Sequence, residues 1–199
     1  MWRIAKNHLL VVSSLDTVLS TPGEERASTA QMLVTTCQNL GETDEALAYQ
    51  ERNLVFWEKA GSPGDVVRGS LSAASMLARR REWERAGAHL QKALAMSSGD
   101  YSAQARVRTG IAAVHAERGH IQRARDEYER ALDLAGKAQE QGLMAHALLG
   151  LGRMALWRQD YQRCAQYLNR ALSLSEKRDT AMEVLSRLEL GKLRFTESS

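Results

Sequence analysis

Apolar residues recur along this chain every three or four positions, which is the spacing of one face of an amphipathic α-helix. Polar residues fill the positions between them, and short polar or glycine-containing turns separate the periodic segments. Proline interrupts helices, and only two prolines occur in 199 residues. The pattern predicts a helix at 2–19, four helix pairs at 25–40/43–60, 64–80/83–97, 101–118/121–138 and 141–158/161–177, and a last helix at about 180–195.

The second helix of each pair repeats one phrase. The chain reads WERAGAHLQKALAM from residue 83, IQRARDEYERALDL from residue 121, YQRCAQYLNRALSL from residue 161 and, more weakly, TDEALAYQERNLVF from residue 43. A small residue recurs in register at Ala46, Ala86, Ala124 and Cys164. Two helices approach to about 8 Å only where the side chains between them are small. We therefore expect these residues to face the first helices, which carry small residues of their own at Ala74, Ala112 and Gly152.

This pattern resembles the tetratricopeptide repeat, a helix-turn-helix unit of 34 residues with small residues at fixed positions. The resemblance extends over residues 25–196, although the copies are four to six residues longer than the family's unit. Val34, Asn53 and Arg81 also stand where the family prefers alanine or glycine. The resemblance implies an all-α fold in one domain, residues 1–199: a right-handed α-solenoid of about four stacked antiparallel helix pairs with flanking N- and C-terminal helices.

By the same resemblance, the first helices of the pairs line a concave groove that binds a partner. The residues expected on this surface are Gln31, Arg68, Leu71, Arg106, Thr109, His146, Leu149 and Arg153. Arginine side chains in such a groove can bind a carboxylate or a phosphate through paired N–H groups. The alternative is that they are solvated charges on a face that binds nothing. Some family members hold a C-terminal carboxylate with lysine and asparagine; other residues stand at those positions here, so that activity is not implied.

No arrangement of residues predicts catalysis, a metal site or a cofactor. Residues 115–117 read HAE, half of a zinc-deaminase signature, but the cysteine half is missing, so His115 is expected to be a hydrogen-bonded core residue. The GLG sequence at 150–152 follows a helix rather than a strand, which excludes a dinucleotide-binding loop. Cys37 and Cys164 match no metal or redox spacing. We expect both to be reduced core residues of a cytoplasmic protein.

These observations predict a non-enzymatic protein–protein interaction module, a scaffold or regulatory arm that binds a protein segment in its groove. The alternative is a ligand- or peptide-sensing domain of a larger bacterial signalling or transcription regulator. The net charge is only +3 and the arginines are mixed with acids, which argues against nucleic acid as a partner. No apolar run is long enough to span a membrane. The helix at 180–195 is apolar on several faces, which predicts self-association through this helix or a continuation of the chain that covers it.

Overall fold

The computed structural model describes residues 2–7, 9–10, 23–175 and 189. Residues 2–7 and 9–10 are helical, and the continuous part of the described chain consists of helices joined by short turns. Because no strand occurs in these ranges, the predicted all-α class is confirmed. No helix in the same ranges is long and apolar enough to cross a membrane.

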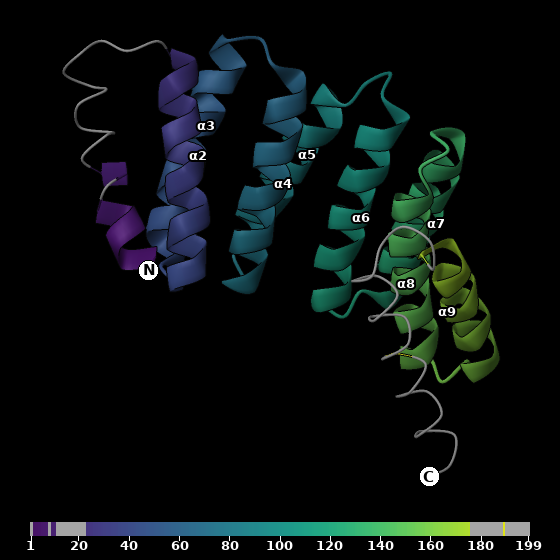
Figure 1. The fold of residues 1–199 in the computed structure, drawn as a ribbon. Helices are drawn as coiled ribbons and strands as arrows, with labels where there is room; N and C mark the ends of the chain where they lie inside the picture. The colour runs from purple at the N-terminus through teal and green to yellow at the C-terminus, as the bar shows by residue number, and fades with distance from the viewer. Residues whose placement is uncertain (1, 8, 11–22, 176–188, 190–199) are drawn as a thin grey trace. The chain divides into compact units, whose positions relative to one another are not determined.

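The helices follow one another in chain order along the described residues (Figure 1). Their bounds are α2 (Gly23–Leu40), α3 (Thr43–Lys59), α4 (Pro63–Arg79), α5 (Trp83–Met96), α6 (Tyr101–Glu117), α7 (Ile121–Lys137), α8 (Gln141–Trp157) and α9 (Tyr161–Ser175). Each end lies within two residues of the bound that the sequence pattern predicts. Much of the predicted helix at 2–19, and all of the predicted helix at 180–195 except Glu189, lies outside the described residues.

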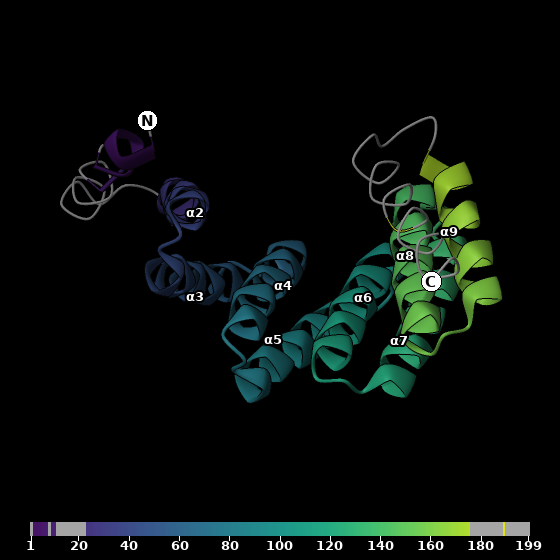
Figure 2. The same ribbon diagram turned by 90° about the horizontal axis from the view of Figure 1, so that it is seen from below.

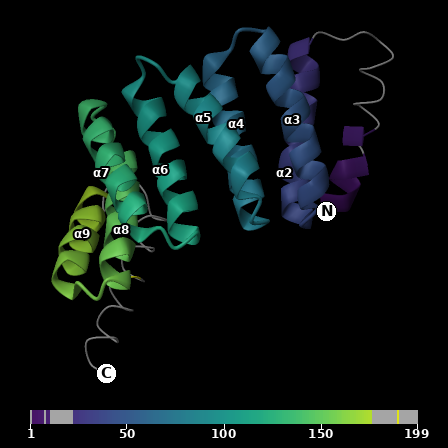
Figure 3. The ribbon, with the colours of Figure 1, turned by 180° about the vertical axis from the view of Figure 1, so that it is seen from behind.

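The chain divides into two compact units, unit 1 (residues 1–96) and unit 2 (residues 97–199). In unit 1, α2 packs against α3, α3 against α4, and α4 against α5. Figure 2 and Figure 3 show the α4–α5 pair from below and from behind. In unit 2, the helices α6 to α9 pack in the same consecutive order, and α6 also contacts α8. Because short turns join neighbouring helices, each unit is built from stacked antiparallel helix pairs.

Small residues at the helix interfaces allow this close packing, as the repeat predicts. Ala112 and Ala124 are fully buried in one core cluster of unit 2, and Cys164 is fully buried in another. A Cβ atom added to Gly150 would overlap the ring of Tyr128. Only glycine therefore fits at the point where α8 meets α7.

The turns that end the first helices contain residues with left-handed backbone conformations. Gly119 has a φ of 75°, and its N–H donates to the carbonyl of Ala116 at 2.9 Å. The next N–H, of His120, donates to the carbonyl of His115 at 2.9 Å, so the two bonds close the last turn of α6. Arg81 occupies the same place after α4 with a φ of 61°. That turn therefore uses a side-chain-bearing residue in a conformation that favours glycine.

Candidate functional site

An open pocket with a volume of about 980 Å³ lies in unit 1, between the N-terminal helical residues and α2, α3 and α4. The middle of α2 forms one wall, the last turn of α3 forms the second, and the first turns of α4 form the third. A pocket of this size can hold a small molecule or the side chains of a peptide segment. We therefore take it as the candidate functional site.

Apolar side chains from separate elements form most of the pocket wall, namely Trp2, Leu9, Met32, Phe56 and Trp57. Trp57 is 7% exposed and packs against the backbone of α4, since a Cβ atom on Gly69 would lie 2.7 Å from its Cζ3 atom. Met32 and Trp2 are 54% and 47% exposed. The pocket thus combines one fixed aromatic ring with apolar side chains that remain open to solvent, a combination found at binding sites.

The polar groups of the pocket are few, and most of them are already paired. Arg68 and Asp65 form an ion pair on α4, and the hydroxyl of Ser62 donates to Asp65 Oδ2 at 2.6 Å. Two threonine hydroxyls on α2 donate to carbonyls of their own helix. The Arg68 side chain is 74% exposed, and the carboxamide of Gln31 makes no hydrogen bond to any described residue. Gln31 and Arg68 are therefore the groups best placed to bond a polar part of a ligand.

Lys6 holds the N-terminal helical residues against the start of α3. Its Nζ atom lies 2.5 Å from Glu42 Oε2 and 2.7 Å from Glu45 Oε2, and its side chain is only 12% exposed. The bonds to Glu42 and then to Glu45 raise the pKa of Lys6 above its ordinary value. Because Trp2 and Leu9 belong to the same helical segment and line the pocket, this clasp also positions the pocket wall.

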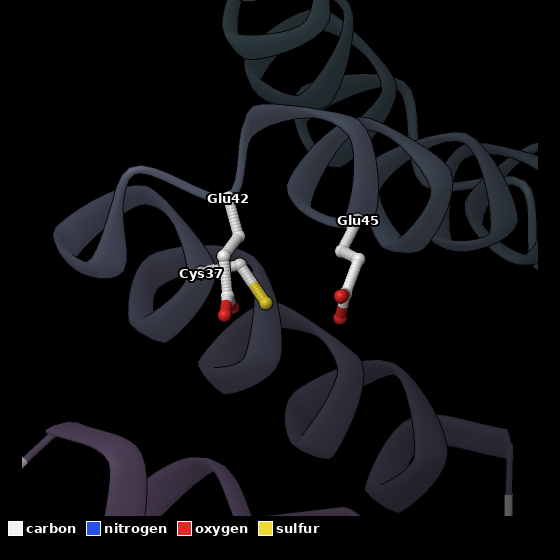
Figure 4. Close-up of side chains that lie close together, drawn as sticks. All are labelled: Cys37, Glu42 and Glu45. Carbon is white, nitrogen blue, oxygen red and sulfur yellow. The ribbon is translucent and has the colours of Figure 1, made fainter.

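Cys37 lies beside the same two carboxylates (Figure 4). Its sulfur and the carboxylate oxygens of Glu42 and Glu45 lie within 4.8 Å of one another, a spacing that a shared metal ion could bridge. However, the Lys6 ammonium already bonds to both carboxylates. Burial also raises the pKa of the Cys37 thiol, whereas a metal ion binds the deprotonated thiolate. The cluster is therefore an ion-pair clasp beside a neutral buried thiol.

Two of the residues predicted for the groove come together in this pocket. Gln31 on α2 and Arg68 on α4 both line it, whereas Leu71 is half-buried further along α4 and does not. In unit 2, Arg106 on α6 and His146 on α8 are exposed.

The other predicted residues of unit 2 are engaged within the unit. The hydroxyl of Thr109 donates to the carbonyl of Ala105 at 2.9 Å. Leu149 is buried in the core between α8 and α9. Arg153 donates from Nη2 to Glu189 Oε1 at 3.1 Å, and the Glu189 side chain is only 6% exposed. A binding role for these residues stays a prediction.

His115 differs from its sequence-based expectation as a hydrogen-bonded core residue. It is half-buried, and its Nδ1 atom is buried without a hydrogen-bond partner among the described residues. The expectation is therefore wrong for this atom. Its ring lies 5.8 Å from the ring of His120. Burial lowers the pKa of His115, and the charges of His120, Arg123 and Arg118 lower it further, while Glu127 acts in the opposite direction.

The aromatic part of the pocket was missed from the sequence, although one signal was available. Trp57 stands where the other copies of the repeat carry Ser97, Ala135 and Ser175. A large ring at a position that is otherwise small departs from the repeat and marks a local feature of unit 1. Asp65 and Arg68 stand three residues apart in the helix predicted at 64–80, a spacing that favours their ion pair.

A family comparison agrees with the repeat pattern. Residues 65–137 match the model of the tetratricopeptide repeat family, and this segment contains nearly all of α4 and the whole of α5, α6 and α7. No curated protein sequence matches the chain.

Solved structures resemble the fold. The crystal structure of BtubC (BKLC) from P. vanneervenii has a TM-score of 0.73 at 16% identity, over 99% of this chain and 82% of that chain. The apo form of RapI has a TM-score of 0.74 at 18% identity, over 95% of this chain and 54% of that chain, so the present chain spans about half of RapI. The TPR2AB-domain:pHSP90 complex of yeast Sti1 has a TM-score of 0.52 at 12% identity, over 100% of this chain and 80% of that chain. At these identities the likeness concerns the fold alone.

The fold and the comparisons define the class of protein. The chain is an all-α repeat protein, and the resemblance to the tetratricopeptide repeat family that its sequence pattern predicts is confirmed.

Proposed function

We propose that this chain is a non-enzymatic protein-interaction module whose unit 1 pocket binds a segment of a partner protein. The observation that carries the proposal is the pocket itself, about 980 Å³ in volume and walled by exposed and half-buried apolar side chains. Tetratricopeptide repeats match residues 65–137, and a structurally similar repeat domain is in complex with pHSP90 in yeast Sti1. Both facts favour a protein partner over a catalytic role.

The lining of the pocket indicates the chemistry of the segment. Trp57 offers a fixed aromatic surface, and Met32 and Trp2 can close over an apolar side chain placed against it. The carboxamide of Gln31 can donate to and accept from a peptide group at the same time. The exposed guanidinium of Arg68 can bond a carbonyl or carboxylate with the N–H groups that Asp65 does not use. We therefore propose a segment with an apolar anchor beside a hydrogen-bonding backbone.

The compartment is part of the same proposal. Both cysteines are buried and neither forms a disulfide within the described residues, and reduced cysteines are typical of cytoplasmic proteins. We propose that the chain meets its partner in the cytoplasm, as a scaffold or as a regulatory arm.

Selection of peptides against the full chain tests the proposal. Peptides from a random display library would be selected, and their Kd would be measured by titration calorimetry with the parent chain and with variants. We expect Arg68→Ala and Met32→Ala to weaken binding at least roughly tenfold, since truncating an interface anchor often costs more than one decade of Kd. Arg79→Ala is the matched control, because Arg79 is an exposed arginine of the same helix that does not line the pocket.

The result that would contradict the proposal is equally specific. If the selected peptides bound the Arg68→Ala and Met32→Ala variants as tightly as the parent, the pocket would not be the binding site. Circular dichroism of each variant would establish that the helical fold is kept, which separates a lost contact from a lost structure.

A second function is favoured by the volume of the pocket, which lies in the range of small-molecule sites. The chain would then be the ligand-sensing part of a regulator. A screen of small metabolites by thermal unfolding distinguishes the two functions: a sensor gains stability from one compound, and Trp57→Ala removes that gain, whereas a peptide-binding module gains stability only from peptides.

A further inference from the structure

One position of the repeat carries an acid in the first, second and fourth copies and a histidine in the third. The residue that precedes the second helix of each pair is Glu42, Glu82, His120 or Asp160. A negative charge is favoured at this place because it lies at the positive end of the helix dipole. His120 provides none, and its side chain makes no capping hydrogen bond to α7.

In the second copy, two arginines hold the acid. Arg85 donates from Nη1 to Glu82 Oε2 at 2.5 Å, and Arg80 Nε lies 2.6 Å from Glu82 Oε1. The hydrogen bond from Arg85, assisted by Arg80, lowers the pKa of Glu82 below its ordinary value. These arginines stand two residues before and three residues after the acid. This spacing therefore forms a carboxylate-binding turn.

The fourth copy, in unit 2, repeats half of the arrangement, the pair between the acid and the arginine three residues after it. Asp160 Oδ1 accepts from the backbone N–H of Arg163 at 3.1 Å, and Arg163 Nε lies 3.5 Å from Asp160 Oδ2. Arg158 stands two residues before the acid, as Arg80 does, although it donates to Gln122 at 3.3 Å. The turn before α9 therefore also contains its own carboxylate.

The third copy keeps both arginines but lacks the acid. Arg118 and Arg123 are exposed, and neither forms an ion pair with a described residue. Two imidazole rings lie at the same turn, those of His115 and His120, with their centroids 5.8 Å apart. Burial lowers the pKa of His115, and the neighbouring His120, Arg123 and Arg118 lower it further, while Glu127 acts in the opposite direction.

We propose that the turn between α6 and α7, through Arg118, His120 and Arg123, binds a carboxylate side chain of an acidic protein segment. In the second and fourth copies Glu82 and Asp160 supply this carboxylate from the chain itself. In the α6–α7 turn site the partner would supply it. A carboxylate is favoured over other anions because the second copy holds one between arginines at the same spacing. The α6–α7 turn site lies in unit 2 and does not depend on the pocket of unit 1.

The proposal has a consequence for pH. A bound carboxylate would offset the positive charge around His115 and raise the pKa of that residue. The complex would then take up a proton that the free protein lacks near neutral pH. Binding is therefore expected to tighten as the pH falls toward the ordinary pKa of histidine, about 6.5.

Nuclear magnetic resonance of the histidine rings in the full chain tests the site. The probe is a short oligoglutamate peptide with blocked ends, added at constant low ionic strength, and an oligoglutamine peptide of equal length is the neutral control. We expect saturable shifts of the His115 and His120 signals with the first peptide and none with the second. Arg118→Ala and Arg123→Ala should each weaken binding roughly tenfold, because a charge-assisted hydrogen bond is lost.

Two further variants separate the proposal from general charge effects. His120→Asp restores the acid of the other copies, so it should abolish oligoglutamate binding and raise the melting temperature. Arg163→Ala removes an arginine that is already paired with Asp160, so it should leave binding unchanged. Equal binding by the parent and by His120→Asp would overturn the proposal. So would a stronger response to inorganic phosphate than to oligoglutamate, because the turn would then be a phosphate site.

Discussion

At the scale of single residues, the packing of unit 2 requires glycine at Gly150, because a larger residue would overlap a neighbouring helix. Gly150 faces the ring of Tyr128, which is only 8% exposed and is held in a core cluster with Ala112, Ala124 and Leu151. The ring cannot retreat without disturbing that cluster, since protein cores are close-packed. Glycine in the middle of a helix lowers helix propensity, so its presence here reflects packing.

The first prediction follows from this contact. Gly150→Ala should lower the free energy of unfolding by about 1–3 kcal/mol through overpacking. Gly136→Ala on α7 is the control, because a Cβ atom there meets nothing within 4 Å; it should raise stability by about 0.5–1 kcal/mol through helix propensity. Urea unfolding followed by circular dichroism measures both changes. Loss of stability in the control as well would mean that the contact with Tyr128 is not the cause.

The second prediction concerns Glu82 and pH. Because Arg85 and Arg80 hold its pKa below the ordinary value, the folded state binds this proton less readily than the unfolded state does. The stabilising contribution of Glu82 is therefore present at neutral pH and is lost as the pH falls through the lowered pKa. Glu82→Gln should melt at a lower temperature than the parent at neutral pH, and the difference should close in acid.

Glu84 provides the comparison for that experiment. It stands two residues after Glu82 and forms no ion pair with a described residue. Glu84→Gln should lower the melting temperature at neutral pH by less than Glu82→Gln does. A constant gap between parent and Glu82→Gln down to acid pH would show that the arginine pairs contribute nothing to the pH dependence.

At the scale of helices, ion pairs tie elements that follow one another in the repeat. Acids recur every seventh residue on α3, and each pairs with a base on or just before α5: Asp44 with Arg80, Glu51 with Arg85 and Glu58 with Lys92. These pairs are largely exposed, so each is worth little. The clasp of Lys6 is different, because its ammonium is shielded from solvent and bonds to two carboxylates at once.

The third prediction tests the clasp through the reactivity of Cys37. Lys6→Met leaves Glu42 and Glu45 close together without a cation, so the N-terminal helical residues should detach more often and expose the thiol. The rate at which an aromatic disulfide reagent labels Cys37 should rise roughly tenfold, as local opening becomes more frequent. Cys164, fully buried in unit 2, should react at its original rate. Faster labelling of both thiols would indicate global destabilisation instead of local release.

At the scale of the whole molecule, repeat proteins are stabilised mainly by contacts between neighbouring units and need polar ends to stay soluble. The sequence at 180–195 carries Val184, Leu185, Leu188, Leu190, Leu193 and Phe195, and these positions do not share one helical face. Glu189 of the same segment pairs with Arg153 of α8. Glu189 is the described residue of this segment, and the spread of the apolar residues in its sequence keeps the prediction of self-association open.

The fourth prediction is self-association through this segment. Light scattering should show a dimer or larger species for the full chain and a smaller species after deletion of residues 180–199. The reason is that apolar residues spread around a helix, as the sequence predicts here, are stabilised when they are buried against a second copy. A monomer in both forms would contradict the prediction. Arg153→Ala would separate the role of the ion pair from that of the apolar residues, because it removes the bond to Glu189 and keeps the segment.

Helices and their register could be predicted from the sequence alone. The bounds of α2 to α9 follow from apolar spacing and turn residues, because helix hydrogen bonds join residues four apart and depend on local sequence. The small residues at Ala124 and Cys164 could likewise be predicted to lie at interfaces, since the repeat places them in register. Gln31 and Arg68, which the resemblance places in the groove, also line the pocket, and a binding role for them stays a prediction.

Tertiary structure decided the rest of the site. Trp2, Met32 and Trp57 meet in one pocket although they come from three separate elements, and the space between them depends on how the helices pack. Lys6 and Glu42 pair across 36 residues, while Arg118 and Arg123 pair with no carboxylate of the described part of the chain. Local periodicity specifies which face of a helix is apolar. Which side chains meet across helices depends on the free energy of the packed structure, because ion pairs and pockets form only after distant elements have been brought together.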